Sequence, residues 1–192
     1  MGMSLKETIR SLKNHFLVAM PSLHNDHFSG TVVYLCEHNA EGAMGLIINQ
    51  QLAIPAKAVF DRLKLAHTHE RGNELIFDGG PIQQDRGFIL HSTSDQIWES
   101  TIYIGGNVSL STSKDILGDI ALGSGPKDSL ITLGYSSWDA GQLESELKEN
   151  NWLTMPADSA IIFNTDCAQR AHAAALSIGL HLDMLALDSG HA

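Results

Sequence analysis

The sequence predicts an α+β fold whose sheet is mixed and largely antiparallel. In the first half of the chain, extended β-branched stretches are separated by short turns, as in hairpins. Amphipathic helices are interspersed without the strict strand–helix alternation of a doubly wound fold. The 192 residues, 43% hydrophobic and 18% charged, are enough for a globular core, and we expect one domain over residues 1–192.

The clearest hairpin lies in the first fifty residues. Apolar residues at spacings of four and three predict a short helix over about 4–13, and an apolar run predicts a strand over 16–20. Strands over 31–36 and 43–48 are rich in β-branched, aromatic and other apolar residues. A five-residue polar turn over 38–42 joins them, so they are predicted to pair as an antiparallel hairpin.

The middle of the chain mixes helices with short strands. A proline in the first turn and an apolar stripe predict a helix over about 55–65. Hydroxyl side chains that can cap a helix precede a second one, over about 113–122. Short extended segments are expected at 74–77, 87–91, within 92–106 and at 108–110.

The stretch from Ile131 to Thr154 is predicted to organise the chain. An apolar strand over 130–133 leads into a polar turn, where three residues are possible caps of a short helix: Ser136, Ser137 and Asp139. Gln142 follows Asp139 at the spacing of a capping box. Trp138 and Trp152 flank the helix, and we expect them to bury its ends.

The C-terminal part is predicted from two kinds of pattern. An apolar run over 160–163 indicates a last core strand. An alanine-rich face over 166–178 indicates a closely packed helix. Residues 180–187 are expected to add an edge strand or a turn.

The charge balance excludes some classes of partner. Asp and Glu number 22 against 12 Lys and Arg, a formal charge of -10, and no cationic cluster offsets it locally. Such a surface repels phosphate, so direct nucleic-acid binding and adsorption to anionic lipid are disfavoured. The chain has no apolar run long enough to span a membrane and its N-terminus has no secretory apolar core, so we expect a cytoplasmic protein.

The segment Cys36–Glu37–His38–Asn39 places a thiol beside an imidazole. Strand alternation would send Cys36 and His38 to one face and Glu37 to the other. The pair has the chemistry of a nucleophile and a base. A buried thiol and a histidine that hydrogen-bonds a turn explain it equally well, and no third orienting group follows from the sequence.

Two other turns have the character of anion sites. Asp78–Pro81 contains Gly79 and Gly80, whose backbone N–H groups can approach a ligand closely. A strand followed by serines and a helix start, as at Ser136 and Ser137, also binds anions. Tight turns and helix capping are the simpler explanations and are favoured.

Ten histidines suggest a metal site, but the spacing does not support one. His24 with His27, and His67 with His69, lack a third ligand at a diagnostic distance in the sequence. A metal protein would need any three of five histidines around one ion: His24, His27, His38, His67 and His69. We therefore expect solvated loop histidines, no metal and no other cofactor.

If the protein has a functional surface, we expect it where three turns that end apolar strands meet. These turns are Glu37–Asn39, Asp78–Pro81 and Ser136–Gln142. No catalytic residue is predicted. The candidate binding residues are Glu37, His38, Asn39, Asp78, Gly79, Gly80, Ser136, Ser137 and Gln142.

Several phrases of the sequence resemble the AlgH/YqgE family of bacterial proteins. They cover nearly the full length in order: FLVAMPSL (16–23), TVVYLCEHNAEGAMGLIIN (31–49), FDGGPIQ (77–83), NVSLSTSKDIL (107–117), GYSSWDAGQLESELKENNWL (134–153) and GHA (190–192). The chain departs from the family at Gln50–Gln51, where Arg-Pro is common, and at Ser137, where glycine is common.

The resemblance implies a bifurcated sheet that curls into a pseudo-barrel with flanking helices. The family name is associated with regulation of alginate production, although the charge of this chain argues against direct DNA contact. Two functions are compared. The first is a non-enzymatic regulatory or interaction protein with an unknown protein or small-molecule partner. The alternative is a small-ligand or nucleotide-phosphate binding protein with weak hydrolase activity.

Overall fold

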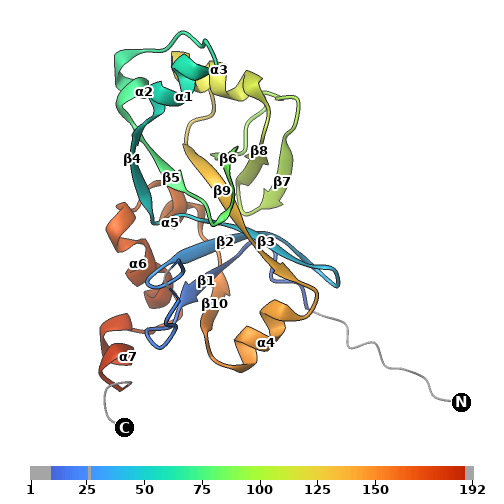
Figure 1. The fold of residues 1–192 in the computed structure, drawn as a ribbon, viewed down its shortest axis with the longest axis vertical. Coiled ribbons are helices and arrows are strands. Elements are labelled where there is room, and N and C mark those ends of the chain that lie inside the picture. Colours follow the sequence, from blue (N-terminus) through green and yellow to red (C-terminus); the bar gives the residue numbers. More distant parts are fainter. Residues whose placement is uncertain (1–9, 26, 189–192) are drawn as a thin grey trace, which may run out of the picture.

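One long strand, β9 (Ser129–Asp139), connects the two halves of the molecule. The computed structural model describes residues 10–25 and 27–188. Within them, ten strands form one sheet in the order β10-β1-β2-β3-β9-β6-β8-β7, and β4 and β5 join it beside β9. The sheet curls into a half-barrel flanked by helices, as the α+β prediction and the family resemblance both expected (Figure 1).

We call the lower part of the sheet in Figure 1 the β2 wing. It contains the second half of β9 and four antiparallel strands: β1 (His15–Ala19), β2 (Val32–Asn39), β3 (Gly42–Ile47) and β10 (Trp152–Pro156). The predicted hairpin of β2 and β3 is confirmed, with Val33 opposite Ile47, but Asn39 pairs with Gly42, so the turn is shorter than the predicted loop over 38–42.

The upper part is the β6 wing. It contains the first half of β9 and five strands: β4 (Gln51–Pro55), β5 (Leu75–Asp78), β6 (Ile82–Ser92), β7 (Ile102–Gly105) and β8 (Val108–Ser111). Among the described residues β5 runs parallel to β9, while the other pairs are antiparallel. The sheet is therefore mixed, as predicted.

Strand β9 passes from one wing to the other at Gly134. This residue has a φ of 73°, and a Cβ there would overlap the carbonyl oxygen of Gly80. A Cβ on Gly79 would in turn overlap the carbonyl oxygen of Gly134. The two backbones thus pack directly on each other where the sheet changes direction, and only glycine fits.

The predicted end of this strand is wrong. The strand continues beyond residue 133, because Met44 and Ala43 of β3 pair with Ser137 and Trp138. These residues therefore belong to the ladder and cannot form the polar turn expected from the sequence.

Helices cover the outer faces of both wings and close one side of the half-barrel (Figure 1). On the β6 wing lie α1 (Ala56–Arg62), α2 (His69–Asn73) and α3 (Lys114–Leu122). On the β2 wing lies α4 (Gln142–Lys148). The C-terminal part contains α5 (Ser159–Phe163), the 3₁₀ turn η1 (Cys167–Gln169), α6 (Arg170–Leu176) and α7 (Leu182–Asp188).

Three apolar clusters hold these layers together. The central cluster fills the half-barrel with side chains from both wings and from α5 and α6, such as Tyr34, Leu90 and Ile162. A second cluster lies under α1 and α3, around Phe60 and Ile116. The third lies between α4 and the β2 wing and contains Trp138, Leu143 and Trp152, so the two tryptophans bury the helix as expected.

Two C-terminal predictions are wrong. The apolar run 160–163 forms helix α5, because the Asp158 carboxylate accepts a hydrogen bond from the Ala160 N–H and starts a helix whose Ile161 and Ile162 fill the central cluster. Residues 182–188 form helix α7 where an edge strand or a turn was expected. In the helix expected over 4–13, residues 4–9 lie outside the described residues, and 10–13 are not helical.

Candidate functional site

The Cys36–His38 pair expected from strand alternation does not form. The pairing of β2 with β3 shifts between Leu35 and Glu37, which is a β-bulge. Cys36 therefore points into the central cluster, while His38 lies opposite Ala43 in the cluster under α4. Burial raises the pKa of the Cys36 thiol to about 12, so this thiol is a packing group and not a nucleophile.

His38 links the hairpin to helix α4. Its Nδ1 accepts a hydrogen bond from the Leu12 N–H at 2.9 Å, which leaves the proton on Nε2 for donation to Glu144 Oε1 at 2.8 Å. Burial opposes ionisation of Glu144, but hydrogen bonds from its backbone and from His38 outweigh this effect and lower the pKa of the carboxyl.

We expect Glu144→Gln to reduce the free energy of unfolding at pH 7 by about 1 kcal/mol, because a charged acceptor of a buried N–H becomes neutral. The folded-state pKa of Glu144 lies below the unfolded value. The stabilisation is therefore present above the unfolded pKa and lost as pH falls through the folded pKa. In urea unfolding, the difference between the two proteins should shrink from pH 7 towards about pH 3. A pH-independent difference would contradict this assignment.

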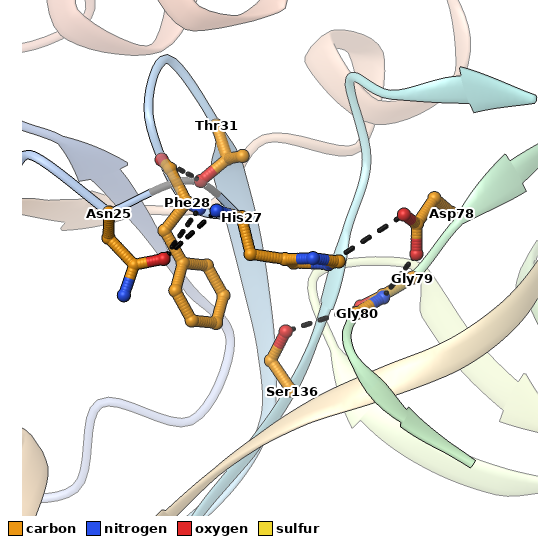
Figure 2. A network of polar contacts seen from close by, with 8 residues as sticks. All are labelled: Asn25, His27, Phe28, Thr31, Asp78, Gly79, Gly80 and Ser136. Atoms are coloured by element: carbon orange, nitrogen blue, oxygen red, sulfur yellow. Dashed lines mark hydrogen bonds and ion pairs between the residues drawn. The ribbon is translucent and has the colours of Figure 1, made fainter. Parts of the chain in front are cut away.

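The glycine turn Asp78–Pro81 packs against β9 (Figure 2). The Gly79 N–H donates to the Leu133 carbonyl at 2.8 Å, and the Gly80 N–H donates to Asp78 Oδ1 at 3.0 Å. Ser136 Oγ donates to the Gly79 carbonyl at 3.3 Å. Both glycine N–H groups thus have acceptors inside the protein, and the turn does not present them to an anion.

His27 also reaches this turn, from the loop before β2 (Figure 2). Its Nε2 lies 3.7 Å from Asp78 Oδ2, and it is buried without a hydrogen-bond partner among the described residues. The backbone N–H groups of His27 and Phe28 donate to Asn25 Oδ1, which shapes the loop. Spacing in the sequence indicated only a solvated loop histidine, because the contact with Asp78 spans fifty residues.

The last predicted turn is partly strand and partly helix start. Ser137 is exposed on β9 opposite Met44. Helix α4 begins after Gly141, whose φ is 78°, so the proposed caps Ser136, Ser137 and Asp139 are wrong. Gln142 is the first residue of the helix and so does not form the expected capping box, although its Oε1 accepts the Asp139 N–H at 3.0 Å.

The nine predicted residues therefore lie at the end of β2, at the end of β5 and the turn after it, on β9 and at the start of α4, without enclosing one site. A hollow of about 190 Å³ lies at the turn of the β2–β3 hairpin, next to Trp138. Of the nine predicted residues, only Glu37 and Asn39 line it. The described residues contain no group of three or more His, Cys, Asp or Glu side chains placed to hold a metal ion. None of their helices is long and apolar enough to cross a membrane.

A larger cavity, of about 330 Å³, lies between the β4–β5 pair, the start of β9 and helix α6. Its walls combine apolar residues (Ala56, Leu75, Ile76, Phe77, Leu130 and Ile131) with polar and charged ones (Gln51, Glu74, Ser129 and Arg170). We call it the Arg170 cavity. A concave apolar space with a few polar groups is typical of small-molecule sites.

Arg170 is the charged group of this cavity that lies deepest, with only 5% of the residue exposed. Its Nε donates to the Thr165 carbonyl at 3.1 Å, and its Nη1 donates to the Ile48 carbonyl. The guanidinium carbon lies 5.1 Å from the centre of the Phe77 ring, in cation–π geometry. Burial lowers the pKa of the Arg170 guanidinium, although Cys167 and Asp166 oppose the shift.

Sequence reasoning did not find Arg170. The available signal was its position four residues before Ala174, a fully buried residue of the alanine-rich face. On a helix this spacing places both residues on one side. Arginine beside a buried alanine stripe therefore indicated a charge facing inward.

Comparison with known proteins identifies the family to which the chain is similar. A family model described as AlgH-like (DUF179) matches residues 16–183. A UPF0301 protein of Albidiferax ferrireducens is 44% identical over 193 residues, covering 96% of this chain and 97% of that protein. A UPF0301 protein of Pseudomonas syringae is 46% identical over 183 residues, covering 94% of this chain and 96% of that protein.

Solved structures agree. The solution structure of the AlgH protein from Pseudomonas aeruginosa covers 100% of both chains, with a TM-score of 0.79 and 45% identity. A crystal structure of a protein from Corynebacterium diphtheriae, 16% identical, covers 94% of both chains with a TM-score of 0.72 and shows the same fold. The sequence phrases, the half-barrel and these relatives lead to one conclusion: the chain belongs to the AlgH-like family of UPF0301 proteins.

Proposed function

We propose that this protein is a non-enzymatic regulatory protein of the cytoplasm, acting as one domain, that binds a small organic ligand in the Arg170 cavity. The cavity itself is the observation that carries the proposal. Its volume of about 330 Å³ falls within the range of small-molecule pockets, and its lining combines apolar walls with polar and charged groups. The association of the family name with regulation supports the regulatory part.

The place of the cavity supports a regulatory use of binding. Its walls come from β5 and β9, which continue into the glycine junction, and from α6, which packs on the central cluster. A ligand there would contact elements that hold the two wings together. Because the chain has a formal charge of -10, we expect regulation through ligand or protein contacts and not through DNA.

Ligand binding can be tested by a thermal-shift screen with small organic acids, alcohols, amides and nucleotides, because a ligand that binds the native state raises the melting temperature. Compounds that bind should also shift the backbone amide signals of Ile76 and Leu130 in NMR spectra, since both residues line the cavity.

A cavity-blocking variant locates the site. Gln51 is exposed on β4 and lines the cavity, so we expect Gln51→Trp to weaken binding at least tenfold. Ile54 lies on the same strand, is 38% exposed and does not line the cavity. Ile54→Trp is therefore the matched control and should bind normally. A screen without binders, or equal weakening by both variants, would contradict the proposal.

A further inference from the structure

The guanidinium of Arg170 is a largely buried charge that forms no ion pair with the described residues, and Asp166 acts on it only from a longer distance. No Asp or Glu oxygen of the described residues lies within 4.0 Å of it, and its partners are the two backbone carbonyls of Ile48 and Thr165. These carbonyl dipoles accept hydrogen bonds from Nε and Nη1 but do not neutralise the positive charge. Removing an ion from water without an opposite charge is costly, and proteins usually compensate it with a paired group.

One nitrogen of the guanidinium is left without a partner among the described residues. Nε and Nη1 are engaged by the two carbonyls, while Nη2 makes no hydrogen bond to the described residues. The Phe77 ring covers one face of the guanidinium, and Arg170 is part of the cavity lining. A ligand in the cavity can therefore contact the positive charge.

We propose that Arg170 binds the carboxylate of a small monocarboxylic acid whose apolar body fills the cavity. This inference rests on the proposed ligand-binding function and adds the chemical class of the ligand. A guanidinium is a preferred partner of a carboxylate, because its planar N–H groups match the two carboxylate oxygens.

A single negative charge fits this cavity better than a double one. Arg170 is the one cation among the lining residues. The other charged lining residue, Glu74, already pairs with Arg71 at 2.9 Å. A phosphate monoester, which approaches two negative charges at neutral pH, would leave about one charge without a partner.

The apolar lining and the volume specify the rest of the ligand. Leu75, Ile76, Leu130 and Ile131 supply aliphatic walls. The cavity of about 330 Å³ is roughly eleven times the ~30 Å³ that one water occupies in the liquid, which is room for an acid of about ten non-hydrogen atoms.

The test compares carboxylates with their neutral amides. Hexanoate, benzoate and phenylacetate, each beside the matching amide, are titrated into the full chain at pH 7 and followed by NMR. We expect each carboxylate to bind at least tenfold more tightly than its amide. We also expect it to shift the side-chain Nε–H signal of Arg170 and leave that of Arg86, an exposed arginine over Phe88, unchanged.

Substitutions separate the two arginines. Arg170→Met should abolish the preference for carboxylates, while Arg86→Met, which removes a similar arginine–phenylalanine contact, should retain it. If Arg170→Met does not fold, the wild-type Arg170 Nε–H signal and its response to the paired amides still decide the question.

The outcomes distinguish this inference from the proposed function. Equal affinity for carboxylates and amides, with shifts at Ile76 and Leu130, would overturn the carboxylate assignment and leave ligand binding in place. A preference for carboxylates that survives Arg170→Met, or leaves the Arg170 signal unmoved, would also overturn it. Absence of binding by every acid and amide would overturn it as well, and the broader screen would then decide the proposed function.

Discussion

Gly134→Ala should reduce the free energy of unfolding by about 3–5 kcal/mol, the sum of a left-handed backbone penalty and a steric overlap. Gly134 has a φ of 73°, which costs an alanine about 1–2 kcal/mol. The added Cβ would overlap the Gly80 carbonyl oxygen and lie 3.1 Å from the Ile82 carbonyl oxygen. These atoms belong to backbone packed at the wing junction and cannot rotate away.

Gly123→Ala is the matched control for this substitution. Gly123 has a similar φ of 77°, but it lies at the end of α3, where nothing is within 4 Å of the position that a Cβ would take. Its cost should therefore be the backbone penalty alone, about 1–2 kcal/mol. Urea unfolding of the three proteins measures both values. Losses of equal size would mean that close packing at the junction contributes nothing.

Glu146→Ala should cost about 2–4 kcal/mol, because one carboxylate oxygen serves two buried indoles. Glu146 Oε2 accepts the Trp138 Nε1–H at 2.9 Å and the Trp152 Nε1–H at 2.8 Å. The two tryptophans are 4% and 5% exposed, so water cannot replace the lost acceptor easily. Their rings pack edge to face at 5.9 Å, and Phe28 contacts both.

Glu149→Ala is the control for Glu146→Ala. Glu149 follows the same helix, is exposed, and accepts hydrogen bonds only from Ser145 and Asn151 among the described residues. We expect a loss below about 0.5 kcal/mol there. Tryptophan fluorescence during urea unfolding provides the measurement. A Glu146 variant as stable as the Glu149 variant would show that the indole hydrogen bonds do not hold α4 in place.

Local patterns in the sequence were sufficient where neighbouring residues determine the structure. The β2–β3 hairpin, the helix over 114–122 and the burial of α4 by Trp138 and Trp152 were all predicted, because turn composition and apolar spacing are local signals. The α+β class and the largely antiparallel sheet followed from these elements.

The predictions failed where residues distant in the sequence determine the local structure. Ser136–Asp139 have the composition of a turn, yet β3 supplies backbone partners that keep them in a strand. The run 160–163 has strand propensity, but Asp158 and the central cluster make it a helix. Sequence alone did not reveal the bulge at Cys36 that separates its side chain from His38.

In the candidate site, too, local features were predicted and features that depend on distant residues were not. The Gly79 turn contacts Ser136 of β9, whereas β3 lies between Glu37–Asn39 and β9. The role of these residues in binding stays a prediction. Arg170 was missed because its contact with the Ile48 carbonyl joins residues 122 positions apart. Turns are visible in a sequence, whereas a cavity closed by two strands and a helix is not.

Because both wings share β9, neither wing can be cut out as a transferable module. Removing either one would leave half of this strand with an open row of backbone donors and acceptors along its edge. Recombination between relatives should therefore succeed only at breakpoints that inherit Ser129–Asp139 as one piece together with its glycine at position 134.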